Sequence, residues 1–391
     1  MKNRSLLLIN ATWAIPSVLF IRSIEPLVSI RICKIFSERA GHFVADIAEQ
    51  IIRNNSKPSK TIYLYYLGGI SNLQWERMAR RSSLIVIGNW LKYIDRWNAI
   101  IPGGNKHKLK SSETNSRDMF GLYQTSEVEL PFLLTEIEEA ENWLESKGWK
   151  QGELFVCLLV RDSEFLEQEF SSIDSNYHSY RDSEIKDYLL AAEWLAAQGV
   201  MVIRMGKVMK EKFQSKHPRI VDYSFDSKKT DLLDIWLFAN CSGVISTGTG
   251  LDVLAAIYKK PQLFLNTVPL SYFWSFADCL WVPKNLVWKE DSRSLTLKEY
   301  LEYSFLRTSD YIYSGIQLID LTENEILRAT MEFFERLCGT RLISKGEDDL
   351  QEKCWQFFKS MPNFSKLHSW KHPDSRIGNS WLISKGEEFF N

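Results

Sequence analysis

The stretch "VISTGTGLDV", residues 244–253, decides the fold. Its β-branched run predicts a strand at 243–247, and a helical pattern follows at 250–260. Between the two stand five small or hydroxylated residues, Ser246, Thr247, Gly248, Thr249 and Gly250. Such a junction either holds a phosphate or forms a capped tight turn, because the same residue types serve both purposes.

Strand and helix patterns alternate on both sides of this junction. Strands are predicted at 154–160, 200–206, 219–225, 243–247 and 262–266, and helices at 183–198, 231–241 and 250–260. This alternation predicts an α/β fold, in which crossover helices join parallel strands. A sheet of this kind binds its ligand beyond the carboxyl ends of its strands.

The first half of the chain has a similar but weaker pattern, with strands predicted at 27–35, 61–67 and 83–88. A chain of 391 residues is long enough for two domains. We expect an N-terminal helix at 1–26, a first α/β domain at 27–135, a second at 150–320 and a C-terminal helical segment at 321–391.

The composition narrows the function. Lys and Arg number 48 against 49 Asp and Glu, so the basic surplus typical of nucleic-acid binding is missing and no nucleic-acid partner is expected. The six cysteines include no C-x-x-C pair, which indicates a reducing compartment. His368 and His372 are spaced like metal ligands but have no acidic third ligand beside them. We therefore expect neither a bound metal nor another cofactor.

The N-terminal segment, residues 5–30, is rich in apolar residues but is interrupted by Pro16, Arg22, Glu25 and Pro26. A membrane-spanning helix needs about 20 mostly apolar residues, and the uninterrupted part is shorter. We favour a helix that lies against a membrane surface. The alternatives are a helix packed on the protein's own core and a single span. The expected location is cytoplasmic, peripheral at the inner face of the membrane.

Polar residues follow several predicted strands, at the edge where a parallel sheet binds its ligand. Gly248 and Gly250 let the backbone approach an anion closely, and the unpaired N–H groups of a helix N-terminus attract one. An arginine fork matches two phosphate oxygens, although Arg204 has an ion pair with Asp222 as its alternative. The candidate residues are Arg161, Tyr180, Arg181, Arg204, Gly206, Ser246, Thr247, Gly248, Thr249, Gly250 and Asn266.

Two histidines are candidates for a general base. His42 follows Gly41 at a predicted turn between strand and helix, and His178 lies in the polar run "YHSYRD" at 177–182. Histidine titrates near neutral pH, so either could accept a proton, or either could be structural. The motifs of P-loop NTPases, zincins, α/β-hydrolases and standard dinucleotide enzymes are absent from the sequence.

Several stretches resemble, in order and spacing, a family of bacterial glycosyltransferases associated with surface polysaccharide synthesis. They are "RDSEFL" (161–166), "YHSYRDSEI" (177–185), "VIRMG" (202–206), "VDYSF" (221–225), "ISTGTGL" (245–251) and "PQLFLN" (261–266). The stretch "PLVSIRICKIFSERAGHF" (26–43) and a C-terminal "SRIGNSWL" (375–382) also resemble it. The likeness covers roughly residues 15–290; one departure is Arg39-Ala40, where Arg-Ile is expected.

The resemblance implies a GT-B-like architecture of two Rossmann-like domains, in which the second binds a nucleotide-sugar donor and the first an acceptor. A metal is usually not needed in such enzymes. The expected reaction moves a sugar from a nucleoside-diphosphate sugar to a hydroxyl of a glycan or lipid-linked acceptor. Residues 246–250 and Arg204 would hold the diphosphate, Arg161, Tyr180 and Arg181 would bind donor oxygens, and His42 or His178 would be the base.

Other readings stay open at this point. A nucleotide-sugar epimerase would share the fold, and a membrane-associated binding subunit would keep the fold without catalysis. An α/β protein with an unrelated ligand is a further alternative, because fold alone does not fix function.

Overall fold

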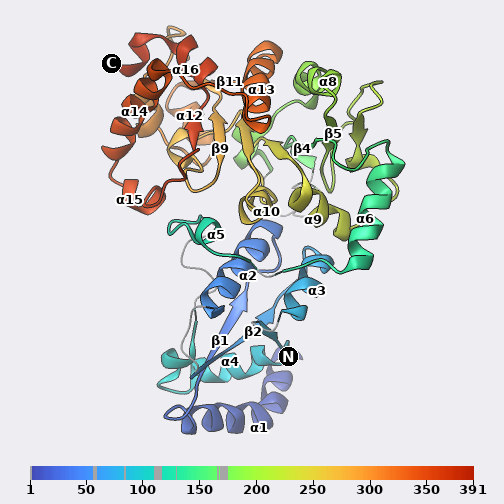
Figure 1. Ribbon diagram of the computed structural model, residues 1–391. Helices are drawn as coiled ribbons and strands as arrows, with labels where there is room; N and C mark the ends of the chain where they lie inside the picture. The colour runs from blue at the N-terminus through green and yellow to red at the C-terminus, as the bar shows by residue number, and fades with distance from the viewer. Residues whose placement is uncertain are drawn as a thin grey trace. The chain divides into compact units, whose positions relative to one another are not determined.

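The computed structural model describes residues 2–55, 60–82, 85–109, 117–128, 130–164, 167 and 175–391. Residues 83–84 of one predicted strand and 165–166 of the family-like "RDSEFL" lie outside this part. The chain forms two compact units (Figure 1). The first comprises Met1–Ser116 with Thr125–Leu133, and the second comprises Arg117–Gln124 with Leu134–Asn391.

The second unit is built on a seven-stranded parallel sheet in the order β12-β9-β8-β7-β4-β5-β6. Its strands are β4 (Phe155–Leu159), β5 (Met201–Arg204), β6 (Ile220–Asp222), β7 (Gly243–Ser246), β8 (Gln262–Leu265), β9 (Cys279–Val282) and β12 (Arg376–Ile377). The chain runs outward from β4 to β6, returns to β7 on the other side of β4, and continues to β9. This is the doubly wound order, and its direction reverses between β4 and β7.

The helices of this unit lie around the sheet, and an antiparallel pair, β10 (Asn285–Trp288) and β11 (Ile316–Ile319), stands apart from it. The α-helices are α6 (Leu134–Ser146), α8 (Leu189–Ala197), α9 (Asp231–Asn240), α10 (Asp252–Ile257), α11 (Leu297–Glu302), α12 (Thr308–Tyr313), α13 (Glu323–Leu337), α14 (Lys345–Lys359), α15 (Phe364–Leu367) and α16 (Asn379–Lys385). Short α5 (Leu122–Thr125) and the 3-10 turns η2 (Ser175–Arg181), η3 (Ile185–Tyr188), η4 (Tyr223–Phe225), η5 (Leu270–Tyr272) and η6 (Glu387–Phe390) complete the set.

The central strands explain why the sequence pattern was readable. Every residue of β4, β5, β7 and β8 is buried, because helices cover both faces of the sheet. Such strands appear in the sequence as short continuous apolar runs rather than as alternating ones. The α/β fold class with parallel strands is therefore confirmed.

Several predicted boundaries differ from those of the structure, two of them substantially. The helix expected at 250–260 is only α10, which begins at Asp252 and ends at Ile257. The segment 321–391 is not a separate helical part: β12 extends the seven-stranded sheet beside β9, and α13 packs on α8. Apolar side chains from this segment pack in the hydrophobic core of the second unit.

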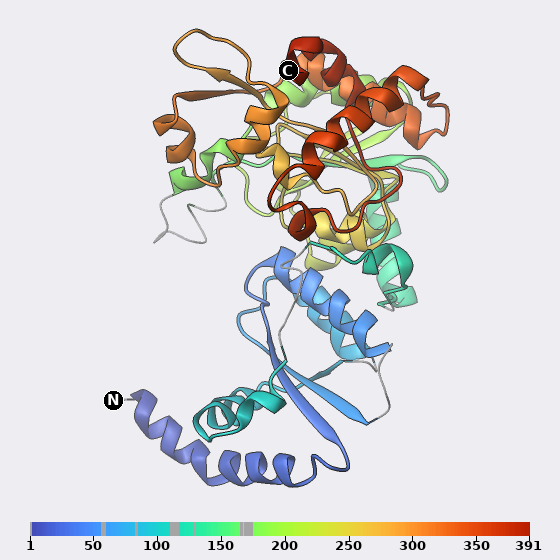
Figure 2. The ribbon, with the colours of Figure 1, turned by 90° about the vertical axis from the view of Figure 1, so that its left-hand side faces the viewer.

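The first unit contains a three-stranded parallel sheet in the order β1-β2-β3. Its elements are α1 (Lys2–Ser23), β1 (Ser29–Ile35), α2 (Ala40–Asn55), β2 (Thr61–Leu67), α3 (Leu73–Arg81), β3 (Val86–Ile87), α4 (Leu91–Ile100) and the 3-10 turn η1 (Gly104–His107). Figure 2 shows β1 and β2 between α2 on one side and α4 on the other. The described part of this sheet is smaller than a complete Rossmann domain.

Helix α1 packs along α4 within the first unit (Figures 1 and 2). Its inner stripe, Ala14, Val18 and Ile21, is buried against Leu91 and Ile94 of α4. On this face, the N-terminal helix is therefore packed on the protein's own core, which was one of the alternatives predicted for it. In the described residues, no helix is long and apolar enough to cross a membrane.

Arg22, at the end of α1, fixes this helix to the last turn of α4. Its guanidinium donates to the carbonyls of Asn98, Ile101 and Pro102 and to Asn98 Oδ1, at 2.6–3.2 Å. These are the carbonyls that a helix leaves without intrahelical partners at its C-terminus. One side chain therefore caps α4 and holds α1.

Replacing Arg22 with methionine keeps the apolar stem and removes the donors. We expect Arg22→Met to lower the unfolding free energy by about 1–3 kcal/mol, because it leaves the carbonyls without their charged partner. Chemical denaturation measures this change. Arg96→Met, at an exposed position of α4, is the control. Equal losses in the two variants would contradict the capping role.

Candidate functional site

The loops that follow β4 and β7 form the candidate site, because the strand order reverses between these two strands. Leu159 and Ser246 are paired at the carboxyl ends of the strands. Thr247 N–H donates to the Leu159 carbonyl at 3.1 Å, and Arg161 N–H donates to Thr247 Oγ1 at 2.9 Å. The two loops are thus bound to each other at the position where doubly wound sheets bind ligands.

The loop after β7 satisfies much of its own backbone. Gly248 has φ +83°, and its N–H donates to Ser246 Oγ at 3.1 Å. Thr249 N–H donates to the Asp252 carboxylate. Two of the N–H groups expected to hold a phosphate are therefore occupied, and the capped-turn interpretation describes this backbone. Gly250 lies just before α10, which begins at Asp252.

Asp252 is a buried acid at the centre of this loop. Burial raises the pKa of its carboxyl to about 7, while hydrogen bonds to the carboxylate and the charge of Arg181 act in the opposite direction. Desolvation thus outweighs the favourable contacts. Near neutral pH this side chain alternates between a neutral acid and a carboxylate.

Two arginines converge on the loop from the other side. Arg181 Nη2 donates to the Gly248 carbonyl, and Arg161 Nε donates to Asp182 Oδ1 at 3.0 Å. Burial lowers the pKa of Arg181, and repulsion by the nearby Arg161 lowers it further. Burial also raises the pKa of Asp182, the acid that partly offsets these charges. Two guanidinium groups held together at one sheet edge favour an anionic ligand.

Two buried polar atoms around the arginines lack hydrogen-bond partners within the described part of the chain. They are Arg161 Nη2 and Thr267 Oγ1. Thr267 follows β8 and lies next to the turn, since a Cβ on Gly248 would come within 3.2 Å of its methyl group. Buried polar atoms in folded proteins are normally paired, so these two favour a ligand that supplies acceptors here.

A pocket lies next to this group, between the loops after β4 and β5. It is lined by Asp162, Asp182, Glu184 and Glu211, together with one cation, Lys210, and neighbouring serines. Carboxylates accept hydrogen bonds from hydroxyl groups and repel phosphates. The carboxyl edge of the sheet is therefore divided into two parts. One is cationic and lies at the switch point, the place between β4 and β7 where the strand order reverses. The other is acidic and lies beside it.

Three of the predicted residues have a structural role within the chain. Arg204 is completely buried, and its guanidinium forms an ion pair with Asp222 at 3.3 Å. An ion pair with Asp222 is the alternative role that the sequence analysis gives for Arg204. Gly206 follows β5 with φ +152°, a conformation that L side chains rarely adopt. Asn266 donates from Nδ2 to Tyr188 OH at 3.1 Å and accepts Leu321 N–H at 2.7 Å, so its amide joins three segments of the core.

The two histidines lie in different units. His178 belongs to η2, three residues before Arg181, and its ring lies against Tyr177 and Tyr180. Tyr180 is buried, and its ring also meets Tyr311.

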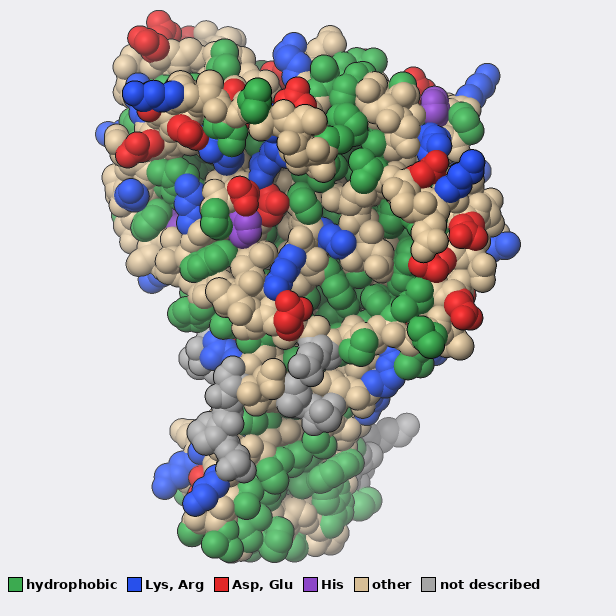
Figure 3. Space-filling view, viewed as in Figure 1, with side chains coloured by type: hydrophobic (Ala, Val, Ile, Leu, Met, Phe, Trp, Pro, Cys, Tyr) green, Lys and Arg blue, Asp and Glu red, His purple; other side chains and the backbone are tan. Residues whose placement is uncertain are grey.

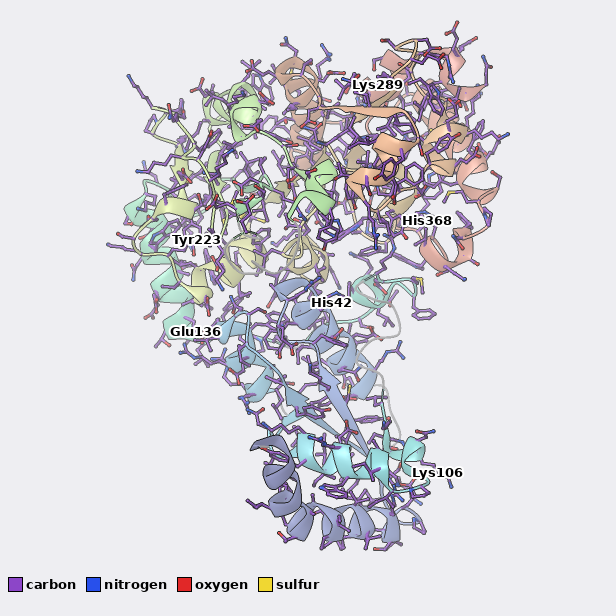
Figure 4. All side chains as sticks on the ribbon, turned by 180° about the vertical axis from the view of Figure 1, so that it is seen from behind. His42, Lys106, Glu136, Tyr223, Lys289 and His368 are labelled. Atoms are coloured by element: carbon purple, nitrogen blue, oxygen red, sulfur yellow. The ribbon has the colours of Figure 1, made fainter. Side chains whose placement is uncertain are left out.

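His42 lies in the first turn of α2, which follows the parallel strand β1 (Figure 4). Burial and the charge of Arg39 lower the pKa of His42, so its imidazole is neutral at pH 7 and able to accept a proton.

Sequence reasoning missed the residues that position Asp182. Lys284 is buried, and its ammonium donates to the Asp182 carbonyl at 2.7 Å and to Asp320 Oδ1 at 2.6 Å. Ser183 Oγ donates to Asp320 Oδ2 at 2.9 Å. Lys284 follows β9, a strand that the sequence pattern did not predict. The signal in the sequence for Asp182 was the polar run "YHSYRD", in which it is the last residue.

Comparisons with known proteins return only distant likenesses. No protein-family model matches the chain. No curated protein matches it either. Among solved structures, the Escherichia coli ADP-heptose lipopolysaccharide heptosyltransferase II aligns at 10% identity with a TM-score of 0.46, covering 78% of this chain and 99% of that one.

Two further matches are a glycosyl transferase of family 9 from Veillonella parvula (10% identity, TM-score 0.42, 65% of this chain and 86% of that one) and the E. coli heptosyltransferase WaaC with ADP (10%, 0.32, 64% and 90%). These three likenesses are too weak to support a conclusion about this chain. The conclusions about the site rest on its own geometry.

The buried acid gives the first prediction for the site. The pKa of Asp252 is raised in the folded state, so the folded chain binds a proton that the unfolded chain releases between about pH 4 and 7. Asp252 therefore makes a contribution to the unfolding free energy that falls as pH rises through this window. In Asp252→Asn this contribution is absent, so the unfolding free energy of the variant relative to the wild type should rise with pH, by up to about 4 kcal/mol over the window.

Denaturation at pH 5.0, 6.0, 7.0 and 7.5 measures the slope. Asp349→Asn, at an exposed position of α14, is the matched control and should retain the wild-type slope. Parallel curves for the wild type and Asp252→Asn would show that Asp252 does not titrate in this range.

Proposed function

We propose that the protein is a glycosyltransferase, which moves a sugar from a nucleoside-diphosphate sugar to a hydroxyl acceptor. The observation that carries this proposal is the pair Arg161 and Arg181 at the switch point between β4 and β7. A doubly wound sheet binds nucleotides at this position, and a diphosphate is the ligand that two clustered guanidinium groups favour. Under this proposal the two units form a GT-B-like enzyme, with the donor in the second unit.

The diphosphate is placed against the arginines and the hydroxyl of Thr267. As the bond to the sugar breaks, negative charge develops on the departing diphosphate. Guanidinium groups already fixed in position stabilise that charge without reorganising. In this proposal they take the role that a metal ion has in other transferases, and the reaction needs no metal.

The adjacent acidic pocket fits the nucleoside part of the donor. In doubly wound folds an acidic residue beside the phosphate site accepts hydrogen bonds from ribose hydroxyls. The carboxylates of Asp182 and Glu211 line the pocket next to the cationic part. A ligand with a diphosphate at one end and hydroxyls at the other matches this division of charge.

Asp252 adapts the site to its charged ligand. As a carboxylate it would repel a diphosphate close to Arg181, whereas as a neutral acid it would not. Its pKa of about 7 means that protonation on ligand binding costs little near neutral pH. Asp252 can therefore be a carboxylate in the empty site and a neutral acid in the occupied site.

The proposed acceptor is a hydroxyl of a glycan or of a lipid-linked molecule, bound by the first unit at the cytoplasmic face of the inner membrane. The base that takes its proton is His42 or His178. His42 is supported by its lowered pKa and by its place at the carboxyl edge of the first sheet. His178 is supported by its position beside Arg181 in η2.

Nucleotide binding is the direct test of the donor site. One of UDP, GDP, CMP, dTDP and ADP should raise the melting temperature of the wild type, because a ligand specific to the folded state stabilises it by about 2.7 kcal/mol at 100 Kd. Arg181→Ala should lose most of this shift. Arg204→Ala should lower the melting temperature without ligand and keep the shift, since Arg204 is paired with Asp222.

Arg293→Ala, which removes an exposed ion pair with Glu299, is the control for loss of an arginine. If no nucleotide shifts the wild type, the donor site is elsewhere or absent, and a binding subunit or an unrelated ligand becomes the better interpretation.

Activity measurements test the base. With the donor that binds, we expect His42→Ala or His178→Ala to reduce turnover by about 10²–10⁴-fold while nucleotide binding is retained. If His42 is the base, the acid side of the pH–rate profile should lie below the ordinary titration range of histidine. Full activity in both variants would reject the base assignment. Donor turnover without any acceptor would instead indicate an epimerase.

A further inference from the structure

The outward face of α1 is the largest feature of the first unit that the proposed function leaves without a role. Ile9, Leu19 and Phe20 on this helix are 67%, 55% and 63% exposed. Leu27, just after the helix, is 73% exposed. No residue from 5 to 21 carries a charge. Among the described side chains of α1, those toward α4 are buried, whereas Ile9, Leu19 and Phe20 leave an apolar surface exposed.

Aromatic side chains continue this face onto α4. Trp90, 55% exposed, meets Trp13 of α1 edge-on, with ring centroids 6.5 Å apart. Tyr93 meets Trp13 in the same way at 5.9 Å. Figure 3 shows hydrophobic side chains gathered over the end of the first unit that α1 covers. Trp and Tyr are the residues most enriched at the boundary between lipid and water.

The charge of the two units differs in sign. The first unit carries 17 Lys and Arg against 9 Asp and Glu, a net charge of +8. The second carries 31 against 40, a net charge of −9. The overall balance of −1 therefore conceals a strongly basic unit, and this is the unit that exposes the apolar face.

Exposed cations lie beside the C-terminal end of α1. Arg22 donates to the Pro102 carbonyl, and the chain continues from Pro102 into η1, which carries Lys106. Lys106 and Lys108 are both exposed, and Figure 4 places Lys106 near the end of α4. Cations that flank an apolar, aromatic surface match the anionic headgroups above a lipid interior.

We propose that the outward face of α1, with Trp90 beside it, docks on the surface of a bilayer that contains anionic phospholipid. A second copy of the chain is a poorer occupant, because two units of charge +8 repel each other. A nucleic acid is also a poorer one, because its charged phosphates would face the exposed apolar side chains of Ile9, Leu19 and Phe20. This inference does not rest on sugar transfer.

Vesicle flotation of the full-length protein is the test. The wild type should float with vesicles of phosphatidylcholine and phosphatidylglycerol, float less with phosphatidylcholine alone, and bind more weakly at raised salt. Leu19→Glu/Phe20→Glu should reduce the bound fraction about tenfold or more, since each side chain loses its apolar burial. Lys106→Glu/Lys108→Glu should also weaken binding, but only to the anionic vesicles.

The matched control is Leu342→Glu/Ile343→Glu, an adjacent exposed apolar pair in the second unit, which should float like the wild type. Melting temperatures verify that each variant is folded. The proposal is overturned if the wild type does not float or if both glutamate pairs reduce binding equally. It is also overturned if Leu19→Glu/Phe20→Glu dissociates a dimer without lipid, or abolishes binding to single-stranded RNA instead of vesicles.

Discussion

The pairing of β4 with β7 is the constraint on which the rest of the second unit depends. From β4 the chain continues to β5 and β6 on one side, and it then returns to β7 on the other side of β4. The loops after β4 and β7 therefore lead in opposite directions, and polar side chains lie between them. The contact from Arg161 N–H to Thr247 Oγ1 joins the loops at this point. Everything attributed to the donor site, including Arg181 and Asp252, is fixed relative to this one junction.

The sheet edge that carries the candidate site could be predicted from the sequence, whereas the contacts within that site could not. Buried parallel strands are continuous apolar runs, so the strands flanking the "STGTG" turn and the edge they share could be predicted. The occupation of Thr249 N–H by Asp252 could not, because an acid three residues after a turn residue is equally consistent with a solvated helix start. The structural role of Arg204 could not be read for a similar reason: the sequence shows which arginines follow strands, but not that the Arg204 guanidinium lies beside Asp222.

The C-terminal region shows the same limit on a larger scale. The two residues of β12 have no pattern of their own, and their strand exists only because β9 offers an open edge. β9 itself was missed, and with it Lys284, which follows that strand and holds Asp182 in place. Short outer strands are determined by their neighbours rather than by local preference, so single-sequence reasoning finds the centre of a sheet before its edges.

The distribution of charge connects the two proposals without making either depend on the other. A transferase whose acceptor is anchored in a membrane must hold one unit at the lipid surface while the other binds a soluble, anionic donor. In this chain the basic surplus belongs to the unit with the exposed apolar helix, whereas the second unit has a net negative charge and places Arg161 and Arg181 between β4 and β7. An acidic unit is repelled by anionic lipid and a basic unit is attracted to it, so under the two proposals the charge asymmetry favours contact of the first unit with the membrane.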